Sequence, residues 1–88
     1  MYSVALSSNM DGILRRLVKK NRKQYAIVLK KIEEIVRNPH RYKNLRAPLN
    51  HLKRVHVDKH FVLTFSIDEE EHAVILMDLD HHDNIYRH

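Results

Sequence analysis

Two short segments of the sequence concentrate side chains that can move protons and bind phosphate. The first contains Arg54, His56 and His60, and the second contains His81 and His82. An imidazole with an ordinary pKa of about 6.5 can accept or donate a proton near neutral pH. The planar guanidinium of arginine matches two phosphate oxygens at once. The two segments are therefore candidates for acid–base chemistry beside a bound phosphate.

The same histidines could also ligate a metal. Imidazole and carboxylate groups suit zinc or manganese, and both occur in the segments His56 to His60 and Asp80 to Asp83. Their spacing matches no standard metal-binding motif, so we expect no metal site and no cofactor. The structural alternative for His56 and His60 is a cross-strand pair on a solvent-exposed face of the sheet. His40, His72 and His88 are expected to be solvated and to have no role.

The chain is small and basic. It has 88 residues, 43% of them hydrophobic, which is enough for one core and a single domain over residues 1–88. Sixteen Lys and Arg against eleven Asp and Glu give a formal charge of +5, so an anionic partner is expected: nucleic acid, an acidic protein or anionic lipid. There is no cysteine, which excludes disulfides and thiol chemistry. The longest apolar run, Ala73 to Met77, is far too short to span a bilayer, so we expect a soluble cytoplasmic protein with no membrane partner.

The first half of the sequence predicts a strand and two amphipathic helices. Tyr2 to Leu6 is β-permissive, and Ser7 to Asn9 contains residues that favour helix N-caps. Apolar residues recur at helical spacing from Met10 to Lys20 and from Tyr25 to Asn38, where a proline ends the pattern. A very short connection near Asn21 predicts an antiparallel hairpin. The Lys and Arg around its apolar stripes are by default a solvated face, and ribosomal RNA contacts are the functional alternative.

The second half predicts a loop and a β-meander. His40 to His51 shows no clean period, and we interpret it as a loop that carries basic and aromatic groups. Strands are expected at Lys53 to Val57, His60 to Asp68 and Ala73 to Asp80, with a turn over Glu69 to Glu71.

Side-chain alternation predicts the register of the first two strands of the meander. Val55 and Val57 have to share the buried face with Phe61 and Leu63, which requires an odd-length loop. A two-residue turn would bury His56, at a cost for a group that can charge. The face away from the helices is then expected to be open and cationic at one end, and to carry Arg54, His56, His60, Val62, Thr64 and Ser66. The predicted fold is α+β: an N-terminal strand, an antiparallel two-helix hairpin and a three-stranded antiparallel meander, with the helices on one face of the sheet.

Two stretches carry a family resemblance: KRVHVDKHFVLTFSID at 53–68 and LDHHDNIY at 79–86. They resemble the RelE/ParE superfamily, the toxins of type II toxin–antitoxin systems, and the order of elements is similar over essentially the whole chain. The RelE and YafQ types are the most similar. This resemblance implies a metal-independent endoribonuclease that cleaves messenger RNA in the ribosomal A site. It also implies contacts with 16S ribosomal RNA and a hetero-oligomer with a RelB- or DinJ-like antitoxin.

The resemblance assigns roles to individual residues. His56 and His82 fall where YafQ-type toxins carry catalytic histidines, and His60 falls where they have an aspartate. Arg54 and Tyr86 fall where RelE-type toxins place a phosphate-binding arginine and a C-terminal tyrosine.

Metal-free RNA cleavage needs a group that takes the 2′-hydroxyl proton, cations that stabilise the five-coordinate phosphate, and a group that protonates the leaving 5′-oxygen. We expect His82 and His56 to transfer protons and Arg46 and Arg54 to contact the phosphate. Tyr86 is expected to stack on a base or to orient the attacking sugar. Further RNA contacts are expected from Lys53, His60, His81, Lys43 and Arg87.

The chain departs from the RelE pattern in places. Where RelE-type toxins usually have an arginine in the central strand, this chain has Phe61 at the nearest equivalent position. His81 and His82 stand in the region where RelE has its C-terminal arginine. Arg46 or His51 is the nearest candidate for the loop histidine of YafQ-type toxins. Two other functions fit the same fold: a ParE-like gyrase inhibitor without nuclease activity, and a catalytically inactive toxin homologue. The histidines favour the nuclease, because gyrase binding needs no proton-transfer groups.

Overall fold

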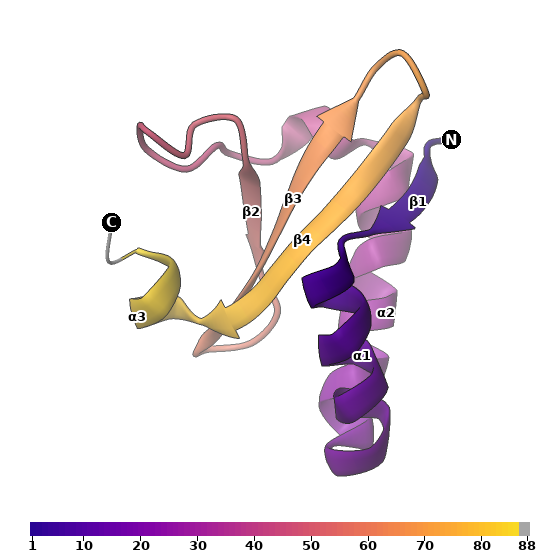
Figure 1. The fold of residues 1–88 in the computed structure, drawn as a ribbon, viewed down its shortest axis with the longest axis vertical. Coiled ribbons are helices and arrows are strands. Elements are labelled where there is room, and N and C mark those ends of the chain that lie inside the picture. Colours follow the sequence, from indigo (N-terminus) through magenta and orange to yellow (C-terminus); the bar gives the residue numbers. More distant parts are fainter. Residues whose placement is uncertain (87–88) are drawn as a thin grey trace.

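The protein folds around one mixed four-stranded sheet, with strand order β1-β4-β3-β2 (Figure 1). The structure, a computed structural model, describes residues 1–86. In chain order its elements are β1 (Ser3–Leu6), α1 (Ser8–Lys20), α2 (Arg22–Arg37), the 3-10 helix η1 (Pro39–Arg41), β2 (Lys53–His56), β3 (Phe61–Asp68), β4 (Ala73–His81) and α3 (His82–Ile85). The α+β fold predicted from the sequence is confirmed, and β1 adds a parallel edge strand beside β4. No helix within residues 1–86 is long and apolar enough to cross a membrane.

A single residue, Asn21, connects the two helices of the hairpin and caps both of them. Its backbone N–H donates to the Leu17 carbonyl at 2.9 Å and closes α1, while its side-chain oxygen accepts from the Gln24 N–H at 3.0 Å and starts α2. Ser7 caps the other end of α1 by accepting from the Met10 N–H at 3.0 Å. Because Ser7 is the cap, α1 begins slightly before the predicted position.

The main core lies between the hairpin and the sheet. Met10, Val28 and Ile35 from the helices pack against Leu63 and Phe65 of β3, and all five side chains are fully buried. Burying a side chain of this size stabilises the fold by roughly 1.5–3 kcal/mol.

Two residues of the predicted apolar stripes lie outside this core. Val18 and Leu29 are 36% and 41% exposed.

A bulge in β4 allows its apolar residues to face the core. Met77 has no partner between the pairs Thr64–Asp78 and Phe65–Leu76, and the extra residue shifts the alternation of the strand by one position. Leu76 on one side of the bulge and Leu79 on the other therefore both join the main core, and Asp78 faces the opposite side of the sheet.

The predicted register of β2 and β3 is confirmed. Val55 pairs with Leu63, and the Val57 N–H donates to the Phe61 carbonyl at 2.9 Å, which closes a three-residue loop over 58–60. The loop is odd-length, so His56 is exposed rather than buried.

The prediction that the second face of the sheet is open is wrong. Val62 and Thr64 on that face are 0% and 2% exposed. A second cluster (Leu45, Val62, Ile85) covers them, with half-buried Leu49 and Leu52 at its side. The cover comes from the loop before β2 and from α3, and neither segment is long enough to show a hydrophobic period in the sequence.

Candidate functional site

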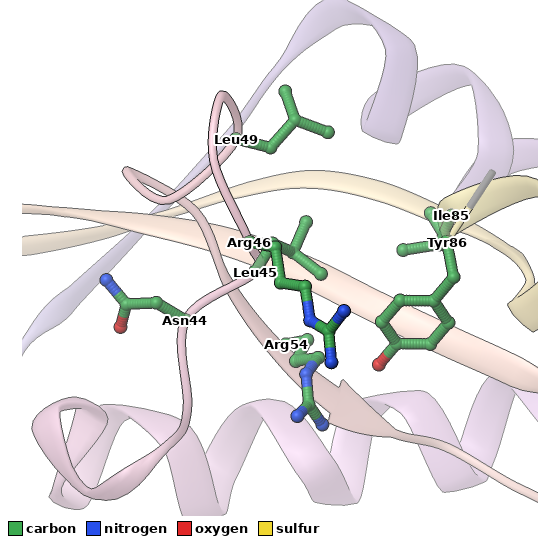
Figure 2. A pocket seen from close by; sticks show the side chains of 7 residues that line it. All are labelled: Asn44, Leu45, Arg46, Leu49, Arg54, Ile85 and Tyr86. Atoms are coloured by element: carbon green, nitrogen blue, oxygen red, sulfur yellow. The ribbon is translucent and has the colours of Figure 1, made fainter. Parts of the chain in front are cut away.

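A pocket of about 310 Å³ opens on the sheet face opposite the helices (Figure 2). Its walls come from the loop after η1, from β2 and from the end of the chain: Asn44, Leu45, Arg46, Leu49, Arg54, Ile85 and Tyr86. Figure 2 shows the Arg46 and Arg54 guanidinium groups pointing to the same side of the pocket. Neither arginine forms an ion pair with a carboxylate within residues 1–86. Two unneutralised guanidinium groups at one pocket favour a phosphate.

Backbone hydrogen bonds hold the loop that carries Arg46. The Leu45 N–H donates to the Leu52 carbonyl and the Leu49 N–H donates to the Arg46 carbonyl, both at 2.9 Å. Arg54 needs no such loop, because β2 places it on the pocket face directly opposite Thr64. The two phosphate-binding candidates are thus presented by a fixed loop and a strand.

Four predicted site residues lie in one row: Arg54, Tyr86, His82 and His56. The Arg54 guanidinium carbon lies 5.6 Å from the centre of the Tyr86 ring. The Tyr86 and His82 ring centres are 5.2 Å apart and edge to face, and those of His82 and His56 are 6.3 Å apart. The row joins a guanidinium that can bind phosphate to two imidazoles that can transfer protons.

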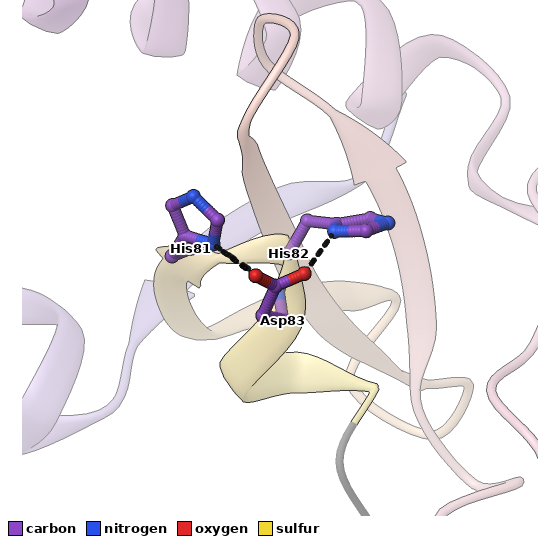
Figure 3. A group of neighbouring side chains, drawn as sticks. All are labelled: His81, His82 and Asp83. Atoms are coloured by element: carbon purple, nitrogen blue, oxygen red, sulfur yellow. Dashed lines mark hydrogen bonds and ion pairs between the residues drawn. The ribbon is translucent and has the colours of Figure 1, made fainter.

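Asp83 fixes the orientation of His82. The His82 Nδ1 lies 2.9 Å from Asp83 Oδ1, and the His81 Nδ1 lies 3.7 Å from Asp83 Oδ2. Figure 3 shows the two imidazoles on opposite sides of the Asp83 carboxylate. When the His82 Nδ1–H donates to Asp83, its Nε2 keeps a lone pair and can accept a proton. From the sequence, Asp83 is a candidate only as a metal ligand, although its position directly after two histidines is a signal for an orienting role.

The same three residues could hold a metal ion. His81, His82 and Asp83 each offer one ligand atom, and these atoms lie within 4.8 Å of one another. Two imidazoles and one carboxylate form a ligand set that zinc accepts. The expectation that the protein has no native metal stays a prediction.

Of the other predicted RNA contacts, His81 adjoins the row, with 6.4 Å between its ring centre and that of His82. His60 was expected on the face of Arg54 but instead stacks on His81, with 5.7 Å between ring centres and 8° between planes. His81 pairs with Phe61, which packs against the main core, so this histidine pair lies toward the helix-covered face.

Lys53 stabilises the loop before β2, and Lys43 lies on its exposed surface. The Lys53 Nζ donates to the Tyr42 carbonyl at 2.9 Å and to Asn44 Oδ1 at 2.8 Å, so its ammonium stabilises the loop. Lys43 is exposed next to Asn44. Arg87 lies outside the described residues. Asn44 and Leu49 line the pocket without any signal in the sequence that marks them.

Comparison with known proteins gives two close relatives and a related solved structure. No family model matches the chain. An uncharacterised protein from Methanosarcina mazei is 62% identical over 86 residues, which cover 98% of this chain and 100% of that protein. A candidate RelE4 toxin from Methanocaldococcus jannaschii is 54% identical over 87 residues, which cover 99% and 93% of the two chains. A chain of the RelBE2 toxin–antitoxin complex from Mycobacterium tuberculosis superposes with a TM-score of 0.74 at 26% identity, covering 91% of this chain and 90% of that one.

Proposed function

Because the chain belongs to the RelE family of toxins of toxin–antitoxin systems, we propose that it is an endoribonuclease that cleaves messenger RNA in the ribosomal A site and so inhibits translation. One observation carries this proposal. Arg46, Arg54 and Tyr86 line one pocket, and His82 and His56 extend from the Tyr86 ring in a row beside it, although the five residues come from three separate parts of the chain.

The two histidines supply the proton transfers. The neutral form of one histidine takes the proton of a 2′-hydroxyl, and the 2′-oxygen then forms a bond to the adjacent phosphorus. The bond from phosphorus to the 5′-oxygen breaks, and the protonated form of the other histidine gives its proton to that oxygen. The products are a 2′,3′-cyclic phosphate and a 5′-hydroxyl. The 6.3 Å between the ring centres of His56 and His82 allows the phosphate to lie against both rings.

The arginines and the tyrosine supply charge and position. Arg46 and Arg54 stabilise the negative charge that develops on the phosphate oxygens as the new bond forms, and fixed cations of this kind lower the barrier strongly. Tyr86 presents a half-exposed ring beside them, suited to stacking on a base. The remaining site residues named from the sequence, Lys43 and Arg87 among them, contribute contacts to the RNA backbone and to 16S ribosomal RNA.

A RelB- or DinJ-like antitoxin is the proposed partner of the toxin. The related chain from Mycobacterium tuberculosis is part of a toxin–antitoxin complex, and a formal charge of +5 suits an acidic partner. Exposed apolar side chains at Val4, Leu6, Val18 and Leu29 give such a partner hydrophobic surface to cover. A ribosomal target also places the protein in the cytoplasm.

Primer extension on a defined messenger RNA in translating ribosomes tests the proposal. Wild-type protein should give cuts aligned with codons, and only when ribosomes are present. His82→Ala should lower the cleavage rate by about a hundredfold or more and leave RNA binding in place. His72→Asn is the matched control, because His72 lies in the turn at the other end of the sheet and asparagine tolerates its positive φ of 52°.

An intact fold with no cut in any condition would overturn the proposal. A DNA supercoiling assay on gyrase would then separate gyrase inhibition from an inactive toxin. Normal cleavage by His82→Ala would keep the nuclease but remove His82 from its mechanism.

A further inference from the structure

A second pocket, of about 470 Å³, lies on the same sheet face as the arginine pocket. It opens between the start of α1, the loop before β2 and the outer side of β4. Leu45, Leu49 and Ile85 line both pockets, so the two cavities are neighbours separated by one apolar wall. Nothing in the proposed cleavage chemistry uses this second pocket.

Two carboxylates on β4 are held rigidly in this pocket. Asp78 Oδ1 accepts from the backbone N–H of the next residue at 2.9 Å and from Asn9 Nδ2 at 3.0 Å. Asp80 Oδ1 accepts from the next backbone N–H at 2.7 Å and from Asn84 Nδ2 at 3.0 Å. The Oδ2 atom of neither aspartate has a hydrogen bond within residues 1–86. Each side chain therefore has one oxygen that fixes its position and one that can accept from a ligand.

Apolar side chains form the other wall of the pocket. Leu45, Leu49 and Leu52 come from the loop before β2. A ligand that fits both walls has an apolar face and N–H donors at its edge. Among nucleobases, guanine alone presents two adjacent donors, N1–H and the N2 amino group, on its Watson–Crick edge, and carboxylates accept well from such donors.

We propose that this second pocket binds a guanine base of the RNA, next to the phosphate held by Arg46 and Arg54. The inference rests on the proposed nuclease function and adds a base preference to it. The neighbouring pocket favours a base over a basic side chain as the occupant. Arg46 and Arg54 can hold the phosphate of the same nucleotide chain, whereas a basic side chain brings no anion for them.

RNA that is not cleaved tests the inference without the nuclease reaction. The probes are fluorescent hexamers of 2′-O-methyl uridine in which one position carries guanine, hypoxanthine, 2-aminopurine or uracil, and anisotropy gives their affinities. Guanine at one position should bind about tenfold or more tightly than uracil. Hypoxanthine, which lacks the amino group, and 2-aminopurine, which lacks N1–H, should each lose part of this advantage.

Asparagine substitutions locate the effect in the pocket. Asp78→Asn and Asp80→Asn keep an Oδ1 for the intramolecular hydrogen bonds but replace the free acceptor with a donor, so each should remove the guanine advantage and leave the all-uridine hexamer bound as before. Asp68→Asn is the matched control, because Asp68 also caps a backbone N–H, that of Glu71, at the far end of β3.

Three results would overturn the inference: no preference for guanine, an unchanged preference in the Asp78/Asp80 double variant, or a change of equal size in Asp68→Asn. A titration with arginine amide, followed by NMR, covers the alternative occupant. Shifts of the Asp78 and Asp80 amide signals with arginine amide, and none with guanosine monophosphate, would assign the pocket to a basic side chain of a protein partner. Guanine preference without any cleavage would refute the nuclease function and support the guanine-binding pocket. Cleavage without base preference would support the nuclease function and refute the guanine-binding pocket.

Discussion

His82 and Tyr86 meet edge to face across one turn of α3, with 5.2 Å between their ring centres. The Tyr86 N–H donates to the His82 carbonyl at 3.1 Å, so the same backbone turn positions both rings. The Arg54 guanidinium carbon lies 5.6 Å from the centre of the Tyr86 ring. A change at Tyr86 therefore affects the proposed proton-transfer residue His82 and the proposed phosphate-binding residue Arg54 together.

Substitutions at Tyr86 should separate the contribution of the aromatic ring from that of its hydroxyl group. Tyr86→Phe keeps the face that stacks on a base and the contact with Arg54, so cleavage should stay close to wild type. Tyr86→Ala removes about 1–3 kcal/mol of base stacking, and kcat/KM should fall by about tenfold or more. Single-turnover cleavage of ribosome-bound messenger RNA measures both. Equal losses in the two variants would instead make the hydroxyl a participant in the chemistry.

Substitutions at Arg54 should distinguish charge from geometry. Arg54→Ala should weaken RNA binding and lower the slope of log K against log salt by about 1. Arg54→Lys keeps the charge and the salt slope but loses the two-pronged contact with phosphate, so binding should recover more than cleavage does. Salt-dependent anisotropy and cleavage rates give the two readouts. Arg37→Ala, at the exposed end of α2, is the control and should change neither; a Lys variant with wild-type cleavage would rule out a bidentate role.

Asp58 should make stability depend on acid pH. Hydrogen bonds from the His60 N–H, the Gln24 amide and the Phe61 N–H hold the pKa of Asp58 below its ordinary value. A carboxyl group whose folded pKa is lowered stabilises the fold above its unfolded pKa, and this contribution disappears as the pH falls through the folded pKa.

Asp58→Asn keeps an oxygen acceptor and loses the charge. The variant should be less stable than wild type by at most about 1 kcal/mol at neutral pH, because solvent screens the charge of this exposed side chain, and the difference should vanish in strong acid, below the lowered pKa. Urea unfolding across this pH range measures both free energies. A deficit that persists unchanged in acid would show that the charge of Asp58 contributes nothing.

Transition metals should inhibit the reaction rather than support it. The proposed proton transfers need no metal, so 1,10-phenanthroline, which spares the magnesium of the ribosome, should leave cleavage unchanged. Zinc should bind His81, His82 and Asp83 and occupy a proton-transfer residue. Asp83→Asn should then need more zinc for the same inhibition. Loss of activity with the chelator would contradict the metal-free mechanism.

Local patterns were enough to predict the four strands and the two long helices of this fold, but not the short helices η1 and α3. Helical periodicity placed both helices, and the alternation of Val55 and Val57 with Phe61 and Leu63 predicted the odd loop between β2 and β3. These features depend on residues that are close in sequence, where the period of the backbone decides which side chains are buried.

The cover of the second sheet face depends on distant contacts, and the sequence did not predict it. Leu45 and Ile85 lie 40 positions apart in the chain and meet on Val62, and no local pattern joins them. Val62 itself was the available signal, because a large apolar residue on a face expected to be open needs a covering group. The parallel pairing of β1 with β4 is non-local in the same way.

The small second cluster under α3 has a consequence for local stability. A single buried side chain of α3, Ile85, anchors it to Leu45 and Val62, whereas β3 contributes several residues to the main core. Local opening of a weakly anchored segment costs far less free energy than global unfolding. We therefore expect the amide protons of α3 to exchange with solvent long before those of β3. If α3 opens in this way, His82 and Tyr86 leave the row while the main core stays folded.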